Sequence, residues 1–173
     1  MAQFWKTVSQ DVSRNKGNLK LLVVLAFRVA HYASVKRKRW IVHAIWAVPI
    51  LVVYRLVFEM IVGIELPAAT TVGPGLILDH GYALVVNKTT IIGSNCRLRH
   101  CTTIGCKIDA NGQQGRSPVL GNNVDVGANA SIIGDINIGD NVVIGAGSVV
   151  VANVPSNTVV AGNPARFIRS ITS

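Results

Sequence analysis

Aromatic side chains are scarce in this sequence, which has 173 residues and only 6% Phe, Trp and Tyr. Half of the residues are apolar all the same, and glycine occupies 16 positions. The chain is long enough to bury a real hydrophobic core. With so few rings, that core is expected to be built from many small and branched side chains rather than from packed aromatic residues.

Cysteine is also rare, and the three in the chain are Cys96, Cys101 and Cys106. An odd number without CxxC spacing argues against a disulfide framework and against a zinc site, and favours reduced thiols in a cytoplasmic protein. Because His100 precedes Cys101, a thiolate nucleophile activated by that imidazole stays open as an alternative.

Acidic residues number eight against 17 Lys and Arg, which gives a formal net charge of +9. The excess is not uniform. Residues 1–63 carry ten basic and two acidic residues, whereas residues 64–173 carry seven and six. The positive charge therefore belongs to one segment, and no nucleic-acid partner is expected. We interpret residues 1–63 as a basic, apolar helical region and residues 64–173 as a separate domain.

Long hydrophobic runs are missing too. The apolar, charge-free run Trp40–Tyr54 has 15 residues and contains Pro49, whereas a spanning helix needs roughly 20. It follows the basic run Lys36–Arg39. Together they predict either a helix at the inner face of the plasma membrane or a helical cap buried in an oligomer, and residues 36–62 are the segment in question. A transmembrane span is a third, weaker alternative.

A six-residue rhythm dominates the second region. Apolar residues recur six positions apart in three series, and glycine often follows them, where it is expected to permit the corner backbone. The series are Leu66, Val72, Leu78; Val86, Ile92, Leu98, Ile104; and Leu120, Val126, Ile132, Ile138, Ile144, Val150. A period of six fits neither an amphipathic helix nor a simple strand. It predicts a solenoid of stacked coils with short strands on its flat faces.

The rhythm has two interruptions, and function is expected where a regular solenoid is interrupted. One is a two-residue offset around residues 79–82. The other is the polar stretch 107–117, which cannot pack inside and is predicted to project as a loop.

Three features resemble the serine acetyltransferase branch of the hexapeptide acyltransferases over about residues 64–169. They are the hexads, the Leu-Asp-His-Gly motif at residues 78–81 and the Val-Ala-Gly-Asn-Pro-Ala-Arg tail at residues 160–166. The resemblance implies a mainly β fold, a left-handed parallel β-helix behind the N-terminal α-helical region. It also implies homotrimers with active sites between neighbouring subunits, and it leaves open whether the trimers pair into hexamers.

A closer resemblance is to acetyltransferases of exopolysaccharide and capsule biosynthesis, such as those for colanic acid. It implies transfer of an acetyl group from acetyl-CoA to a hydroxyl, with His80 as general base, because a hydroxyl needs a base that titrates near neutral pH. In the family an Asp fifteen residues before this His orients the imidazole, and Glu65 occupies that position here.

Five residues are assigned to acetyl-CoA by the same resemblance. Gly105 is expected near the thioester, and Ala128 and Ala146 match alanines that contact the CoA arm. Arg166 and Arg169 are candidates for its phosphates.

The expected acceptor residues are Asp79, Arg116, Ser117 and His100. In serine acetyltransferases an Arg-His pair helps to bind the serine carboxylate, and here Ser117 stands in place of that His. This departure favours a sugar hydroxyl as acceptor, with L-serine as the alternative. A three-His zinc site of the γ-carbonic anhydrase type is short of ligands, because His80 and His100 are the histidines of the coils. We therefore expect no metal.

Overall fold

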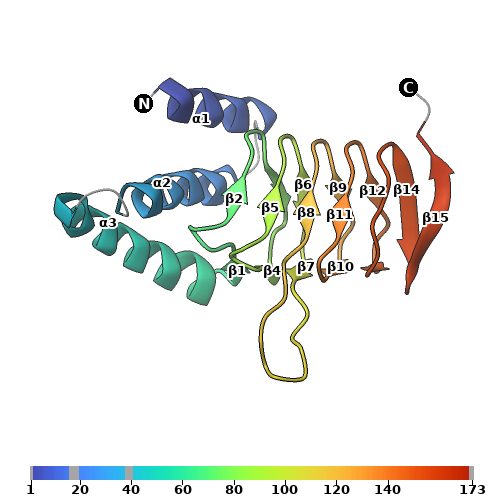
Figure 1. Cartoon of the computed structure of the whole chain (residues 1–173). Coiled ribbons are helices and arrows are strands. Elements are labelled where there is room, and N and C mark those ends of the chain that lie inside the picture. Colours follow the sequence, from blue (N-terminus) through green and yellow to red (C-terminus); the bar gives the residue numbers. More distant parts are fainter. Residues whose placement is uncertain (1, 16–19, 38–40, 172–173) are drawn as a thin grey trace.

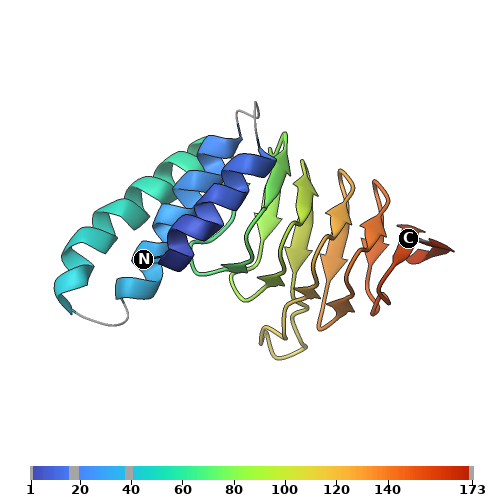
Figure 2. The same ribbon diagram turned by 90° about the horizontal axis from the view of Figure 1, so that it is seen from above.

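The computed structural model describes residues 2–15, 20–37 and 41–171, which form a helical layer at one end of a stack of β-coils (Figure 1). The helices are α1 (Ala2–Arg14), α2 (Leu21–Arg37), α3 (Ile41–Tyr54) and the π-helix η1 (Arg55–Ile61), which continues α3. Seen from above, α2 lies between α1 and α3, so α3 has a helical neighbour on one side (Figure 2). Within the described ranges, no helix is both long and apolar enough to cross a bilayer.

Short strands follow, and they stack into three sheets. Sheet A contains β1 (Ile64–Glu65), β4 (Leu84–Val86), β7 (Thr103–Gly105), β10 (Ser131–Ile133) and β13 (Val149–Val150). Sheet B contains β2 (Thr71–Val72), β5 (Ile91–Ile92), β8 (Val119–Leu120) and β11 (Asn137–Ile138). Sheet C contains β3 (Ile77–Asp79), β6 (Arg97–Arg99), β9 (Asp125–Val126), β12 (Val143–Ile144), β14 (Thr158–Gly162) and β15 (Ala165–Ser170). The strands of each sheet pair in parallel, except β14 with β15, so successive coils pass through sheets A, B and C in turn.

The core of the β-helix is the set of residues that the six-residue rhythm marked. All thirteen members of the three series are buried, with exposed fractions of 9% or less. The predicted fold class, a mainly β parallel β-helix with an N-terminal helical region, is confirmed. Each coil buries its inward residues against the next one, so the coils are stable only as a stack.

Both interruptions of the rhythm are visible in the strand register. Ile77 of β3 pairs with Arg97, twenty positions on, whereas Val85 of β4 pairs with Thr103, eighteen positions on. Two extra residues therefore lie at the corner between β3 and β4. Ile91 pairs with Val119, twenty-eight positions on, which places ten extra residues between β7 and β8. They form the loop that projects from the stack in Figure 1.

The corners between sheets B and C are turned by asparagine, which sequence analysis did not expect. Asn123, Asn141 and Asn157 have positive φ, and their side-chain amides form a ladder with hydrogen bonds of 2.9 and 2.8 Å. Asparagine tolerates this left-handed conformation better than other L-residues. The glycines serve close packing instead, since a Cβ on Gly127 would lie 2.5 Å from the backbone nitrogen of Ala146.

A buried ion pair fastens the helices to the first coil. Arg28 of α2 is 4% exposed and donates to the carboxylate of Asp11 on α1 at 2.7 Å. The guanidinium also donates to the backbone oxygens of residues 72–73, and Asp11 accepts from the backbone N–H groups of residues 75–76. Two helices and the corner between β2 and β3 are thus connected by one charged group of each sign.

Candidate active site

His80 lies directly after β3, at the corner where sheet C passes to sheet A. Its φ is +66°, a conformation that a non-glycine residue adopts only at a cost and that concentrates at functional sites. Gly81 and Ala83 of the same corner also have positive φ. The two extra residues thus produce an irregular corner with an exposed imidazole.

His100 lies under His80 on the next coil, because Asp79 pairs in register with Arg99. The two imidazole rings meet edge to face, with 5.7 Å between centroids and 78° between planes. His100 is half-buried, and its Nδ1 atom is buried with no hydrogen-bond partner among the described residues. A buried polar atom without a partner is costly unless a ligand or water satisfies it.

A row of small residues continues down the same corner. By register, Ala128 lies below His100 and Ala146 lies below Ala128. The corner backbones are connected, since the Asn129 N–H donates to the His100 carbonyl at 3.0 Å and the Gly147 N–H donates to the Ala128 carbonyl at 2.9 Å. Ala128 is half-buried and Ala146 exposed. These methyl groups leave an extended, narrow chain such as pantetheine room to approach the backbone.

Glu65 lies on β1, one coil before His80, and it is exposed. Its neighbour Ile64 reaches the His80 corner, where its Cδ1 atom would lie 3.2 Å from a Cβ on Gly81. Neither Glu65 nor His80 donates to or accepts from the other in the described part of the chain. Burial raises the pKa of nearby Glu59 on η1, and the negative charge of Glu65 raises it further, against the lowering effect of Arg55.

Asp79 is already paired. Arg97 lies 3.2 Å from its carboxylate, and on the neighbouring coil Arg99 pairs with Asp125. This charged ladder on sheet C was not predicted from the sequence. The sequence does contain a signal for this pair, because Asp79 and Arg97 are eighteen residues apart, which is about one coil. The positive charge of Arg97 offsets the negative charge of Asp79 beside the imidazole.

Arg116 and Ser117 belong to the projecting loop, which leaves the stack between sheets A and B. Ser117 is buried, and its hydroxyl shares a 2.7 Å hydrogen bond with the hydroxyl of Thr89. Arg116 is exposed and lines a pocket of about 570 Å³ with Asp135 and others. Within one chain, the structure therefore groups Asp79 and His100 with His80 but places Arg116 and Ser117 at another corner.

The remaining predicted residues are spread along the stack. Gly105 ends β7 in sheet A, and its carbonyl accepts from the Gly134 N–H at 2.9 Å. Arg166 and Arg169 are exposed on β15, at the end of the stack farthest from the helices (Figure 1). Among the described residues, no three His, Cys, Asp or Glu side chains form a group that could hold a metal ion.

The three thiols are expected to react very differently. All are free, with Cys101 exposed, Cys106 half-buried and Cys96 buried. Burial raises the pKa of Cys96 to about 11, so its thiol stays protonated well above neutral pH. Titration with a chromogenic disulfide at pH 8 should release two equivalents rapidly and the third only after unfolding. Cys96→Ser should leave the rapid count unchanged, and three rapid equivalents would contradict the described burial.

Comparisons with known proteins identify the family to which this fold belongs. Residues 117–152 match the family model described as bacterial transferase hexapeptide (six repeats). The chain is 43% identical over 158 residues to the "Putative colanic acid biosynthesis acetyltransferase WcaB" of Escherichia coli K12, which covers 91% of this chain and 96% of that protein. It is 34% identical over 161 residues to the serine acetyltransferase of Helicobacter pylori 26695, which covers 90% and 88%.

Solved structures give the same picture. The soybean serine acetyltransferase apoenzyme superposes with a TM-score of 0.80 at 29% identity, covering 97% of this chain and 70% of that one. The Neisseria gonorrhoeae serine acetyltransferase superposes with a TM-score of 0.80 at 30% identity, covering 100% and 67%. Fold and site thus define a hexapeptide-repeat transferase. The chain belongs to the family of hexapeptide-repeat acetyltransferases, and it is an acetyltransferase with acetyl-CoA as co-substrate.

Proposed function

We propose that the protein transfers the acetyl group of acetyl-CoA to a saccharide hydroxyl in surface polysaccharide biosynthesis. The observation that carries this proposal is the match over 96% of a protein named for colanic acid biosynthesis. The structure supports it with an exposed imidazole at the corner between β3 and β4, which carries two extra residues.

In the proposed reaction His80 accepts the proton of the acceptor hydroxyl while that oxygen attacks the thioester carbonyl. The imidazolium then returns the proton to the departing thiolate, so no covalent enzyme intermediate is needed. Glu65 would orient the imidazole and stabilise its protonated form, which requires its side chain to move toward His80 when substrates bind. Ala128 and Ala146 would line the CoA arm, with Gly105 near the thioester.

We further propose that the complete site forms between two subunits of a homotrimer. Arg116 lies at a different corner from His80 within one chain, so it reaches the imidazole only if a neighbouring copy presents its loop. Cyclic assembly of copies around a three-fold axis repeats such a contact three times and closes the ring. The exposed Arg166 and Arg169 would then contact the CoA phosphates.

The choice of a sugar over L-serine rests on two contacts. Arg97 offsets the charge of Asp79, which weakens the attraction of that carboxylate for an amino group. Ser117 stands where a carboxylate-binding His would be, and its hydroxyl is engaged by Thr89. L-Serine is the second candidate acceptor because the serine acetyltransferase of Helicobacter pylori 26695 is 34% identical over 90% of the chain.

An acceptor screen tests the proposal. Thiol release from acetyl-CoA is expected to accelerate with nucleotide sugars or lipid-linked oligosaccharides and to stay at background with L-serine. Mass spectrometry should then show one added acetyl group on the saccharide, and the same mixtures with the His80→Ala variant are the control. Rapid release with L-serine and none with any saccharide would show that the enzyme forms O-acetylserine instead.

We also propose that the enzyme acts at the cytoplasmic face of the plasma membrane. The support is the basic, apolar N-terminal region, with its net charge of +8 over residues 1–63. A lipid-linked acceptor would be presented at that face.

A further inference from the structure

Over residues 45–58, helix α3 and its continuation η1 bury one stripe of their surface. Ala47 and Tyr54 are buried, and Leu51 and Phe58 are partly buried against the core, at positions that recur every three to four residues. The rest of the helix is apolar as well. We call the α3 apolar surface the exposed side chains of Ile45, Trp46, Val48, Ile50, Val52 and Val53. A helix that is apolar on all sides is normally covered on all sides.

The side chains of this surface are large, and the described residues of the chain do not cover them. Trp46 is 77% exposed and Ile45 is 71% exposed. Because α2 contacts α3 from one side, the opposite side of α3 faces outward from the helical layer (Figure 2). Isolated exposed apolar residues are ordinary, but a contiguous group of this kind marks an interaction site.

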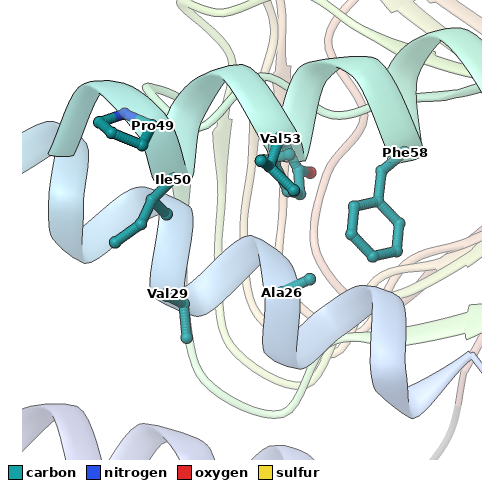
Figure 3. Close-up of a pocket in the computed structure, with 7 residues that line it drawn as sticks. Ala26, Val29, Pro49, Ile50, Val53 and Phe58 are labelled. Atoms are coloured by element: carbon teal, nitrogen blue, oxygen red, sulfur yellow. The ribbon is translucent and has the colours of Figure 1, made fainter. Parts of the chain in front are cut away.

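An apolar pocket of about 400 Å³ adjoins the surface, between α2 and α3 (Figure 3). Its lining consists of Ala26, Val29, Pro49, Ile50, Val53, Tyr54 and Phe58. The one polar group of this lining, the hydroxyl of Tyr54, already donates to the Leu66 carbonyl at 2.7 Å. The pocket therefore offers no polar group to a ligand and suits hydrocarbon.

The charge around α3 favours anionic phospholipid over a second copy of the chain as the partner of this surface. The basic run at residues 36–39 immediately precedes the helix. The two acidic residues of the region are already neutralised, Asp11 by Arg28 and Glu59 by Arg55 at 3.7 Å. A second copy would bring a region of +8 against another of +8. Anionic phospholipid attracts the same charges, and a basic segment beside an apolar, Trp-bearing helix is the pattern of an interfacial membrane helix.

We propose that the α3 apolar surface docks into the interface of a membrane rich in anionic phospholipid, with Lys36 at the headgroups. Docking itself is argued from the α3 apolar surface alone. Only its purpose, which is access to a lipid-linked acceptor, rests on the proposed function. The docked helix leads directly to the catalytic end of the stack, because α3 continues into η1 and η1 contacts β1. Glu65 lies on that strand, so docking would hold the first coils, with Glu65 and His80, close to the lipid surface.

The test uses the full-length protein and vesicles of phosphatidylcholine with and without phosphatidylglycerol, separated by sedimentation. Wild type should bind the anionic vesicles and lose binding as salt is raised. The double variant Ile45→Ser, Trp46→Ser should bind at least about tenfold more weakly, since two large side chains no longer enter the lipid. The matched control Phe167→Ser, Ile168→Ser removes two exposed apolar side chains of β15 and should bind within about twofold of wild type.

Two results would overturn docking. One is failure of wild type to bind anionic vesicles at low salt, and the other is equal binding by the α3 double variant. If a second copy covers the surface instead, sedimentation velocity will show the α3 variant with a smaller assembly mass and unchanged vesicle binding. Acetyl transfer to a water-soluble saccharide tests the proposed function separately, because the α3 variant should retain it fully whether or not wild type binds lipid.

Discussion

His80→Ala is expected to lower kcat/KM for acetyl transfer by roughly 10²- to 10⁴-fold, the usual contribution of a general base. A hydroxyl is a poor nucleophile until its proton is removed, and the exposed imidazole at the widened corner is the group placed to remove it. Thiol release from acetyl-CoA with the acceptor found by screening measures the effect. KM for acetyl-CoA should change little, since the imidazole is not expected to hold the CoA arm.

The matched control is His31→Gln, which replaces an imidazole far from the corner. Nδ1 of His31 lies 2.9 Å from the Ala68 carbonyl, and an amide can keep that contact. Its activity should stay within a few-fold of wild type. If His80→Ala retains full activity while its circular dichroism and assembly mass are unchanged, the protein transfers acetyl groups without this base.

Asp11→Ala should lower the free energy of unfolding by about 3–5 kcal/mol, because it leaves the Arg28 guanidinium buried without its counter-ion. It also removes the acceptor for two backbone N–H groups of the first coil. The double variant Asp11→Ala, Arg28→Met should recover part of the loss, since it removes the uncompensated charge but leaves those N–H groups without partners. Urea unfolding followed by circular dichroism measures both.

Arg55→Ala is the control for this experiment. Arg55 also pairs with an acidic residue, Glu59, but its side chain is 78% exposed and the separation is 3.7 Å. Exposed pairs of this kind contribute at most about 1 kcal/mol. A loss for Asp11→Ala as small as that for Arg55→Ala would mean that the helices are not fastened to the first coil through this pair.

The β-helix could be predicted from sequence because its burial pattern is local and repeats. Each coil repeats the environment of the one before, so Leu98 and Ile144 are both buried, inward-facing apolar residues although they lie 46 residues apart. The offset at residues 79–82 could also be predicted from the sequence, because two extra residues interrupt a regular six-residue spacing. Glycine was predicted to permit the corner backbone, and several glycines do so by allowing close contact between coils, whereas asparagine takes the positive φ at the corners between sheets B and C.

Contacts between non-repeating parts could not be predicted. Asp11 and Arg28 lie on different helices, and neither position repeats, so no spacing connects them. The relation of Arg116 to His80 depends on the assembly, which a periodic pattern in one chain does not encode. The roles of His80 and Glu65 stay predictions, because catalytic contacts often tighten only when substrates bind.

The reversal of the chain at β15 also ends the stack of parallel coils. A stack of parallel coils exposes unpaired backbone groups at its last strand, which could add a coil of another molecule. Here β15 runs antiparallel to β14 and covers that edge, with a shift in register after Val159. Arg166 and Arg169 place positive charge on the new outer strand, and charged edge strands resist further pairing. The strand proposed to hold CoA phosphates thus also ends the solenoid and guards it against end-to-end polymerisation.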